Sequence, residues 1–180
     1  MVNDTKPDWL QTVSAPHPSR QPLDRFERDC QLTMTRRSGP GGQHRNKTST
    51  AIVLVHQPTQ VSGEASESRS QAKNRSVAVQ RLRLNLAVVI RCLESDEEAD
   101  IELRKKHAGR SVWVAEQNPQ RPAVISLVLD DMVRYQGDLQ QVAKEWRTTA
   151  SQLLKLLRSE TPAIDYMNRL RAFYELRPLR

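Results

Sequence analysis

Three of the chain's six glycines lie within four consecutive residues, Gly39-Pro40-Gly41-Gly42, and Gln43 follows them directly. Pro40 fixes its own φ and favours extended geometry at the residue before it, while glycine adopts φ values closed to other residues. The pattern predicts a tight, exposed loop that offers one amide side chain. Because an amide neither titrates nor acts as a useful nucleophile, chemistry here would work by positioning and hydrogen bonding.

Basic residues flank this loop, and they are Arg36, Arg37, Arg45 and Lys47. The chain's formal net charge is +7. The basic excess is concentrated between residues 36 and 91, which hold ten Lys and Arg against two Glu. Such surfaces attract phosphate backbones and make affinity dependent on salt. A merely solvated charged face has the same composition, and the loop motif favours contact with RNA.

His44 is the alternative catalytic group, since a histidine beside a loop can act as a general base. No paired carboxylate or nucleophile completes such a site, so we expect His44 to face RNA. His56, at a predicted strand end, is expected to be structural. Cys30 and Cys92 lack metal-ligand spacing, which predicts buried, reduced thiols, no metal and no cofactor.

The residues around the loop predict a small antiparallel sheet. Cys30, Leu32 and Met34 alternate with polar residues, which is the period of a half-buried strand. Residues 49–56 predict a second strand rich in β-branched residues, and residues 61–65 fit a short third one. The loop is expected to project from one end of this sheet.

A helix is predicted directly after the sheet. Ser68 with Gln71 three residues later fits a capping box. Apolar residues then recur at spacings of three and four, forming a stripe that can cover a face of the sheet. The residues of this stripe are Val79, Leu82, Leu86, Val89 and Leu93.

Composition divides the chain into four segments. Residues 1–22, with four prolines, are predicted to be a flexible leader, and residues 23–95 hold the sheet, loop and helix. Residues 96–121 open with an acidic stretch and are predicted to be a linker. Residues 122–180 predict a small all-helical domain, so the fold class is α+β.

The last segment contains a pattern typical of a helix-turn-helix unit. Residues 139–146 and 151–157 predict two short helices joined by a brief turn, and a further helix follows. A plain packing domain shows the same pattern, so both interpretations stay open. Nucleic-acid readout by this unit would use Gln152, Lys155 and Arg158.

The sequence from about residue 23 to residue 93 resembles the catalytic domain of class I peptide chain release factors. The matching positions lie in the loop, in the strand after it and at the start of the helix. They are Ser38 to Gln43, Asn46, Thr48, residues 51–59, Ser68 to Gln71, and Asn74. Gln60 stands where the family usually has glycine, so this turn is expected to differ in shape.

That family hydrolyses the ester joining a finished peptide to tRNA in the peptidyl-transferase centre. The resemblance implies catalysis by Gly41, Gly42 and Gln43, with the backbone N–H of Gln43 donating to the oxyanion. A preorganised donor of this kind contributes about 3 kcal/mol. The resemblance implies loop-shaping roles for Ser38, Gly39 and Pro40, and RNA contacts from Arg36, Arg37, Arg45, Lys47, Arg69, Lys73 and Arg75.

The implied partners are the large ribosomal subunit, its RNA and peptidyl-tRNA, with a methyltransferase that modifies Gln43. Full release factors read stop codons through Pro-x-Thr or Ser-Pro-Phe elements, and neither string occurs here. The chain therefore resembles the short, codon-independent relatives that rescue stalled ribosomes, acting on whole ribosomes or on split subunits. Those relatives often end in a disordered basic tail. Here apolar residues interrupt the arginines of residues 169–180, which predicts a partly folded end.

Two other functions are compatible with the sequence. One is a non-catalytic RNA- or DNA-binding adaptor that acts through the helix-turn-helix-like segment. The other is hydrolysis of free peptidyl-tRNA without ribosomes, which is disfavoured because no general base is evident. The apolar runs are too short to span a membrane, and the N-terminus lacks a secretory or transit pattern. These features predict a cytoplasmic protein, which we expect to be monomeric.

Overall fold

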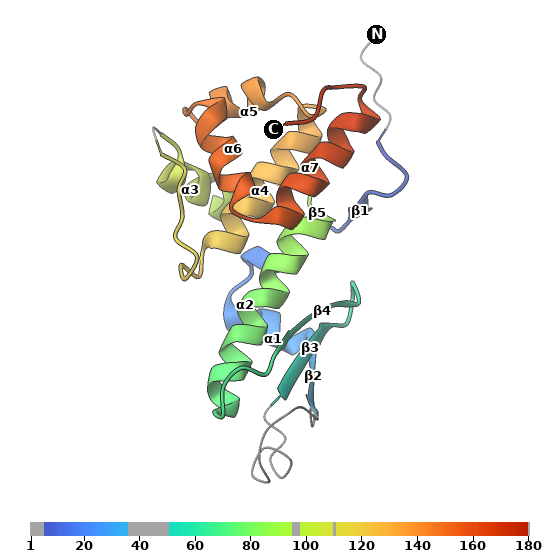
Figure 1. Ribbon diagram of the computed structural model, residues 1–180, viewed down its shortest axis with the longest axis vertical. Coiled ribbons are helices and arrows are strands. Elements are labelled where there is room, and N and C mark those ends of the chain that lie inside the picture. The colour runs from blue at the N-terminus through green and yellow to red at the C-terminus, as the bar shows by residue number, and fades with distance from the viewer. Residues whose placement is uncertain (1–5, 36–50, 95–97, 110, 180) are drawn as a thin grey trace. The chain divides into compact units, whose positions relative to one another are not determined.

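Figure 1 shows the computed structural model, which describes residues 6–35, 51–94, 98–109 and 111–179. The Gly-Gly-Gln loop and its basic flanks, residues 36–50, lie outside the described residues. The chain divides into two compact units. We call Gln21–Leu86 the sheet unit, and Met1–Arg20 together with Ala87–Arg180 the helical unit.

The sheet unit is built on three antiparallel strands in the order β2-β3-β4 (Figure 1). Helix α1 (Leu23–Arg28) leads into β2 (Cys30–Thr35). After the loop come β3 (Ala51–His56) and β4 (Val61–Ala65), and β4 pairs with Ile52 to His56 of β3. This sheet confirms the strands predicted from alternation and β-branched content.

Helix α2 (Gln71–Val89) follows the sheet and packs against β4. A Cβ atom built on Gly63 would lie 2.4 Å from the backbone nitrogen of Leu82, so the helix and the strand approach backbone to backbone. The predicted stripe is correct for Leu82 and Leu86, which are fully buried. It is wrong at its end, because the helix stops at Val89 and that side chain is exposed.

The start of α2 also differs from the predicted capping box. Ser70, rather than Ser68, precedes the helix, and its Oγ accepts a hydrogen bond from the backbone N–H of Lys73 at 3.3 Å. The hydroxyl of Ser68 accepts from the N–H of Ser70 at 3.1 Å. Ser68 and Ser70 thus satisfy backbone donors that a helix start leaves unpaired.

The helical unit is assembled around α4, which is buried from Arg121 to Val133. Pro122 lies in its first turn, where the missing N–H costs nothing. The other helices pack around it, and Leu127, Trp146 and Leu153 are fully buried between them. The helices are α3 (Glu98–His107), α4 (Arg121–Arg134), α5 (Leu139–Glu145), α6 (Ala150–Arg158) and α7 (Thr161–Phe173). None of the described helices is both long enough and apolar enough to cross a membrane.

Residues 6–20, part of the predicted flexible leader, make specific contacts in the helical unit. Strand β1 (Gln11–Thr12) pairs in parallel with β5 (Ile90–Arg91), and His17 Nε2 lies 3.0 Å from the carbonyl oxygen of Ile90. After the short 3-10 helix η1 (Pro18–Arg20), the guanidinium of Arg20 forms ion pairs with Asp100 and Asp130. The segment predicted to be a linker contains α3. The predicted boundaries at residues 22, 95 and 121 stay predictions.

The described end of the chain folds back on α7. Asn168 Nδ2 donates to the carbonyl oxygen of Leu179 at 3.2 Å, and the N–H of Leu179 donates to Asn168 Oδ1 at 2.8 Å. Arg171 Nε donates to the carbonyl oxygen of Arg177 at 2.8 Å. These contacts agree with the partly folded end that was predicted for residues 169–180.

Candidate functional site

The chain enters and leaves the Gly-Gly-Gln segment at two paired residues. Thr35, the last residue of β2, is the Cα partner of Ala51, the first residue of β3. Ala51 is buried, and the next rung pairs Met34 with Ile52. Both ends of residues 36–50 are therefore attached to neighbouring strands at one end of the sheet. The catalytic and loop-shaping residues predicted within this segment lie outside the described residues.

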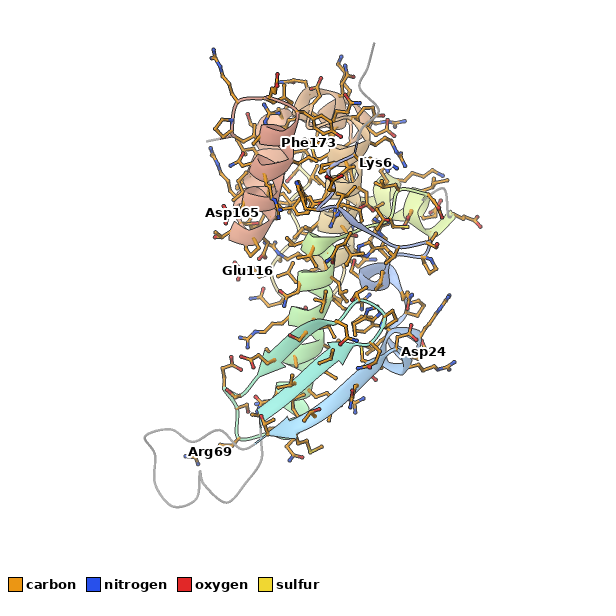
Figure 2. All side chains as sticks on the ribbon, turned by 90° about the vertical axis from the view of Figure 1, so that its right-hand side faces the viewer. Lys6, Asp24, Arg69, Glu116, Asp165 and Phe173 are labelled. Carbon is orange, nitrogen blue, oxygen red and sulfur yellow. The ribbon has the colours of Figure 1, made fainter. Side chains whose placement is uncertain are left out.

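The start of α2 lies at the same end of the sheet. Gln71 Nε2 is 3.9 Å from the sulfur of Met34, near the end of β2. The buried Asn74 fixes the turn before the helix, since it donates to the carbonyl oxygen of Ser68 at 2.8 Å and accepts from the N–H of Ser68 at 2.9 Å. Figure 2 places Arg69, inside this turn, at one end of the sheet unit and Asp24 at the other.

The described RNA-binding candidates fall into two groups. Arg69 and Lys73 are exposed beside the turn that Asn74 fixes, and neither forms an ion pair with a described carboxylate. Arg75 Nη2 lies 3.0 Å from Glu27 Oε2 on α1. Exposed pairs of this kind contribute at most about 1 kcal/mol, so Arg75 can exchange Glu27 for a phosphate at low cost.

His56 is structural, as predicted. It is buried, its Nδ1 lies 2.8 Å from Thr59 Oγ1, and its ring stacks on Phe26 with centroids 6.0 Å apart. Burial lowers the pKa of His56, while Asp29 opposes this more weakly. A buried, neutral imidazole holds the β3–β4 turn in place and offers no acid or base to a substrate.

The two thiols are also structural. Cys30 is partly buried, and its Sγ donates to the carbonyl oxygen of Phe26 at 3.2 Å. Burial, followed by the charges of Asp29 and Glu27, raises the pKa of Cys30 to about 11. Cys92 is fully buried, and burial raises its pKa as well. Both thiols stay protonated and inert at neutral pH.

The structure adds two residues that sequence reasoning did not assign to this scaffold. Arg83 is partly buried. Its Nη2 donates to the carbonyl oxygen of Gln21 at 2.8 Å, and its guanidinium lies over Phe26 at 5.5 Å. Gly63 is the second, because it lets α2 touch β4. An isolated glycine inside a strand signals such a close approach and could have identified it.

Comparison with known proteins places this arrangement in a family. The RF-1 domain pattern matches residues 23–125. Over 99 residues the chain is 41% identical to a protein from Rattus norvegicus named "Peptide chain release factor 1-like, mitochondrial", which covers 55% of this chain and 24% of the rat protein. It is 34% identical over 100 residues to "Peptide chain release factor 1, mitochondrial" from Homo sapiens, and the match covers 56% of this chain and 22% of the human protein.

A bacterial relative extends the similarity further along the chain. "Peptide chain release factor 1" from Lachnoclostridium phytofermentans is 36% identical over 138 residues, which covers 71% of this chain and 37% of the bacterial protein. In all three comparisons the matched region is well under half of the relative's own length. The similarity therefore concerns one domain of these proteins.

Proposed function

We propose that this chain, which belongs to the RF-1 domain family, hydrolyses the ester bond of peptidyl-tRNA on the large ribosomal subunit. The catalytic residues in this proposal are Gly41, Gly42 and Gln43. The observation that carries it is the match of residues 23–125 to the family, and Gly41, Gly42 and Gln43 fall within this range. The pairing of Thr35 with Ala51 supports it, because a loop that acts by positioning requires fixed ends.

In the proposed reaction, water attacks the ester carbonyl and forms a tetrahedral intermediate with an oxyanion. The backbone N–H of Gln43 donates to this oxyanion, and the side chain of Gln43 places the water and excludes bulkier nucleophiles. The C–O bond then breaks, the peptide leaves as a carboxylic acid, and the tRNA hydroxyl recovers a proton. Gly41 and Gly42 permit the close approach that this donation requires.

Basic residues position the loop against RNA. Arg69 and Lys73 support this role, because both are exposed beside the start of α2. Arg36, Arg37, Arg45 and Lys47 would contact ribosomal RNA or the tRNA acceptor end, and Arg75 would do so after leaving Glu27. The partners in this proposal are the large subunit, its RNA and peptidyl-tRNA.

The finer part of the proposal is codon-independent rescue of stalled ribosomes. The proposal also includes a monomeric, cytoplasmic protein whose Gln43 is methylated by a partner enzyme.

The test measures release of labelled peptide from purified ribosomes that carry peptidyl-tRNA. Three matched complexes are compared: one on a message truncated in the decoding site, one at a stop codon and one halted mid-message. Codon-independent rescue predicts release on the truncated complex. Release at the stop codon alone would contradict the rescue role, and absence of release on all three and on split large subunits would contradict hydrolysis.

A further inference from the structure

The helical unit carries an exposed tryptophan beside two cations. Trp113 lies in the chain between α3 and α4 and is 44% exposed. Lys155 Nζ, on α6, lies 5.2 Å from the centroid of its ring, and Arg121 Cζ, on α4, lies 5.6 Å from it. An aromatic ring with cations nearby attracts them through its negative faces.

Buried neighbours hold this tryptophan in place. Val112 and Val114, on either side of Trp113, are buried, so the chain alternates inward and outward as a strand does. The Nη1 of Arg121 donates to the carbonyl oxygen of Val114. The same guanidinium donates through Nε to Glu160 at 2.9 Å, and through Nη2 to Ser159 Oγ at 2.6 Å. The indole is therefore presented on a rigid base.

The outward face of α6 is positively charged, and its Lys155 reaches the indole. Ser151, Lys155 and Arg158 are exposed and stand four and three residues apart, which places them on one side of the helix. From residue 146 to residue 159 the chain contains three basic residues and no acidic one. The carboxylate of Glu160 is already paired with Arg121, so it does not neutralise this face.

We propose that Trp113, Lys155 and Arg158 form a binding surface for single-stranded RNA. An unpaired base would replace the Lys155 ammonium over the indole, and Lys155 and Arg158 would contact the adjacent phosphates. Such surfaces combine an aromatic platform with a basic groove. The bases of a duplex are already stacked on one another, so stacking on the indole requires an unpaired strand. This inference concerns binding by the helical unit and does not depend on the chemistry proposed for Gln43.

The test is a fluorescence-anisotropy titration of the full chain with a short labelled oligouridylate at several salt concentrations. Loss of one stacked base predicts that Trp113→Ala binds roughly tenfold more weakly, whereas Trp113→Phe keeps most of the affinity. Loss of one phosphate contact predicts that Lys155→Ala lowers the slope of log K against log salt by about 0.7.

Two control variants separate this surface from the rest of the chain. Phe173→Ala removes an aromatic side chain of similar exposure, 41%, from the last residue of α7. Figure 2 shows Phe173 apart from Glu116, which follows Trp113 by three residues. This variant is expected to bind like the wild type. Gln43→Ala is expected to leave oligouridylate binding unchanged while it abolishes release. Failure of the proposed release chemistry would therefore not be mistaken for failure of this surface.

Several outcomes would overturn the proposal. One is equal affinity of folded Trp113→Ala and the wild type. Another is tighter binding to duplex DNA that depends on Arg158 and not on Trp113, which would support a helix-turn-helix mode instead. If circular dichroism shows that Trp113→Ala is unfolded, the Lys155→Ala and Arg158→Ala variants test the proposed surface in its place. Unchanged RNA affinity and an unchanged salt slope in both variants would reject the surface.

Discussion

Thr35 and Ala51 are direct partners in the β2–β3 ladder, although fifteen residues separate them in the chain. Their pairing attaches both ends of the Gly-Gly-Gln segment to one sheet. A catalytic loop that supplies hydrogen bonds rather than a nucleophile depends on such attachment, because a misplacement of about 1 Å can cost roughly hundredfold in rate. The stability of the sheet unit should therefore influence release as well as folding.

Gly63→Ala tests the close packing of α2 against β4 on which this stability depends. The added Cβ would lie 2.4 Å from the nitrogen of Leu82 and 2.7 Å from the carbonyl oxygen of Ala78, and backbone atoms cannot rotate away. We expect the free energy of unfolding to fall by about 1–3 kcal/mol, the usual cost of overpacking. Urea denaturation followed by circular dichroism measures it. Ser62→Ala, at an exposed neighbouring position, is the control, and equal midpoints for the two variants would contradict the close packing.

His56 predicts a pH dependence of stability. Burial lowers its pKa below the ordinary value of 6.5, so the unfolded chain binds more protons than the folded one once the pH falls below about 6.5. The free energy of unfolding should therefore decrease on acidification through this range, and should be unaffected by this group at higher pH. His56→Gln should show a shallower decrease in urea titrations at a series of pH values. A slope equal to that of the wild type would show that His56 is not held neutral.

Cys30 should react slowly with alkylating reagents despite its partial exposure. A pKa of about 11 leaves little thiolate at neutral pH. Compared with a free cysteine, whose pKa is about 8.5, the reaction should be slower by roughly hundredfold near neutral pH. Mass spectrometry of the Cys92→Ala variant, which leaves Cys30 as the one thiol, measures the rate. Urea-unfolded protein is the control, and equal rates in the folded and unfolded chains would refute the raised pKa.

Local patterns predicted the sheet unit well, because alternation and helical periodicity depend on neighbouring residues. The ladder and the buried face of α2 at Leu82 and Leu86 follow from those patterns. The packing of residues 6–20 could not be predicted in this way, since Arg20 forms an ion pair with Asp130, which lies more than a hundred residues further along the chain. Prolines alone do not reveal such a partner.

The residues of the candidate site also divide into those that local sequence predicts and those that only distant contacts reveal. The glycine-rich motif identifies Gly41, Gly42 and Gln43 as candidates from sequence alone. The pairing of Arg75 with Glu27 depends on how α1 lies beside α2, which no local signal reports. Trp113 gave no signal either, because a single tryptophan between two valines reads as an ordinary strand. Its exposure and its neighbouring cations emerge when α4 and α6 come together.

The most direct test of the central claim is the rate of peptide release from ribosomes carrying peptidyl-tRNA, measured in single turnover for the wild type and Gly42→Ala. Gln140→Ala, which changes an exposed glutamine on α5, serves as the control. A methyl group at Gly42 would disturb the backbone that presents the Gln43 N–H, and loss of one such donor costs roughly hundredfold or more in rate. We predict a loss of that size for Gly42→Ala and none for Gln140→Ala. Release by Gly42→Ala at the wild-type rate would contradict catalysis by this loop.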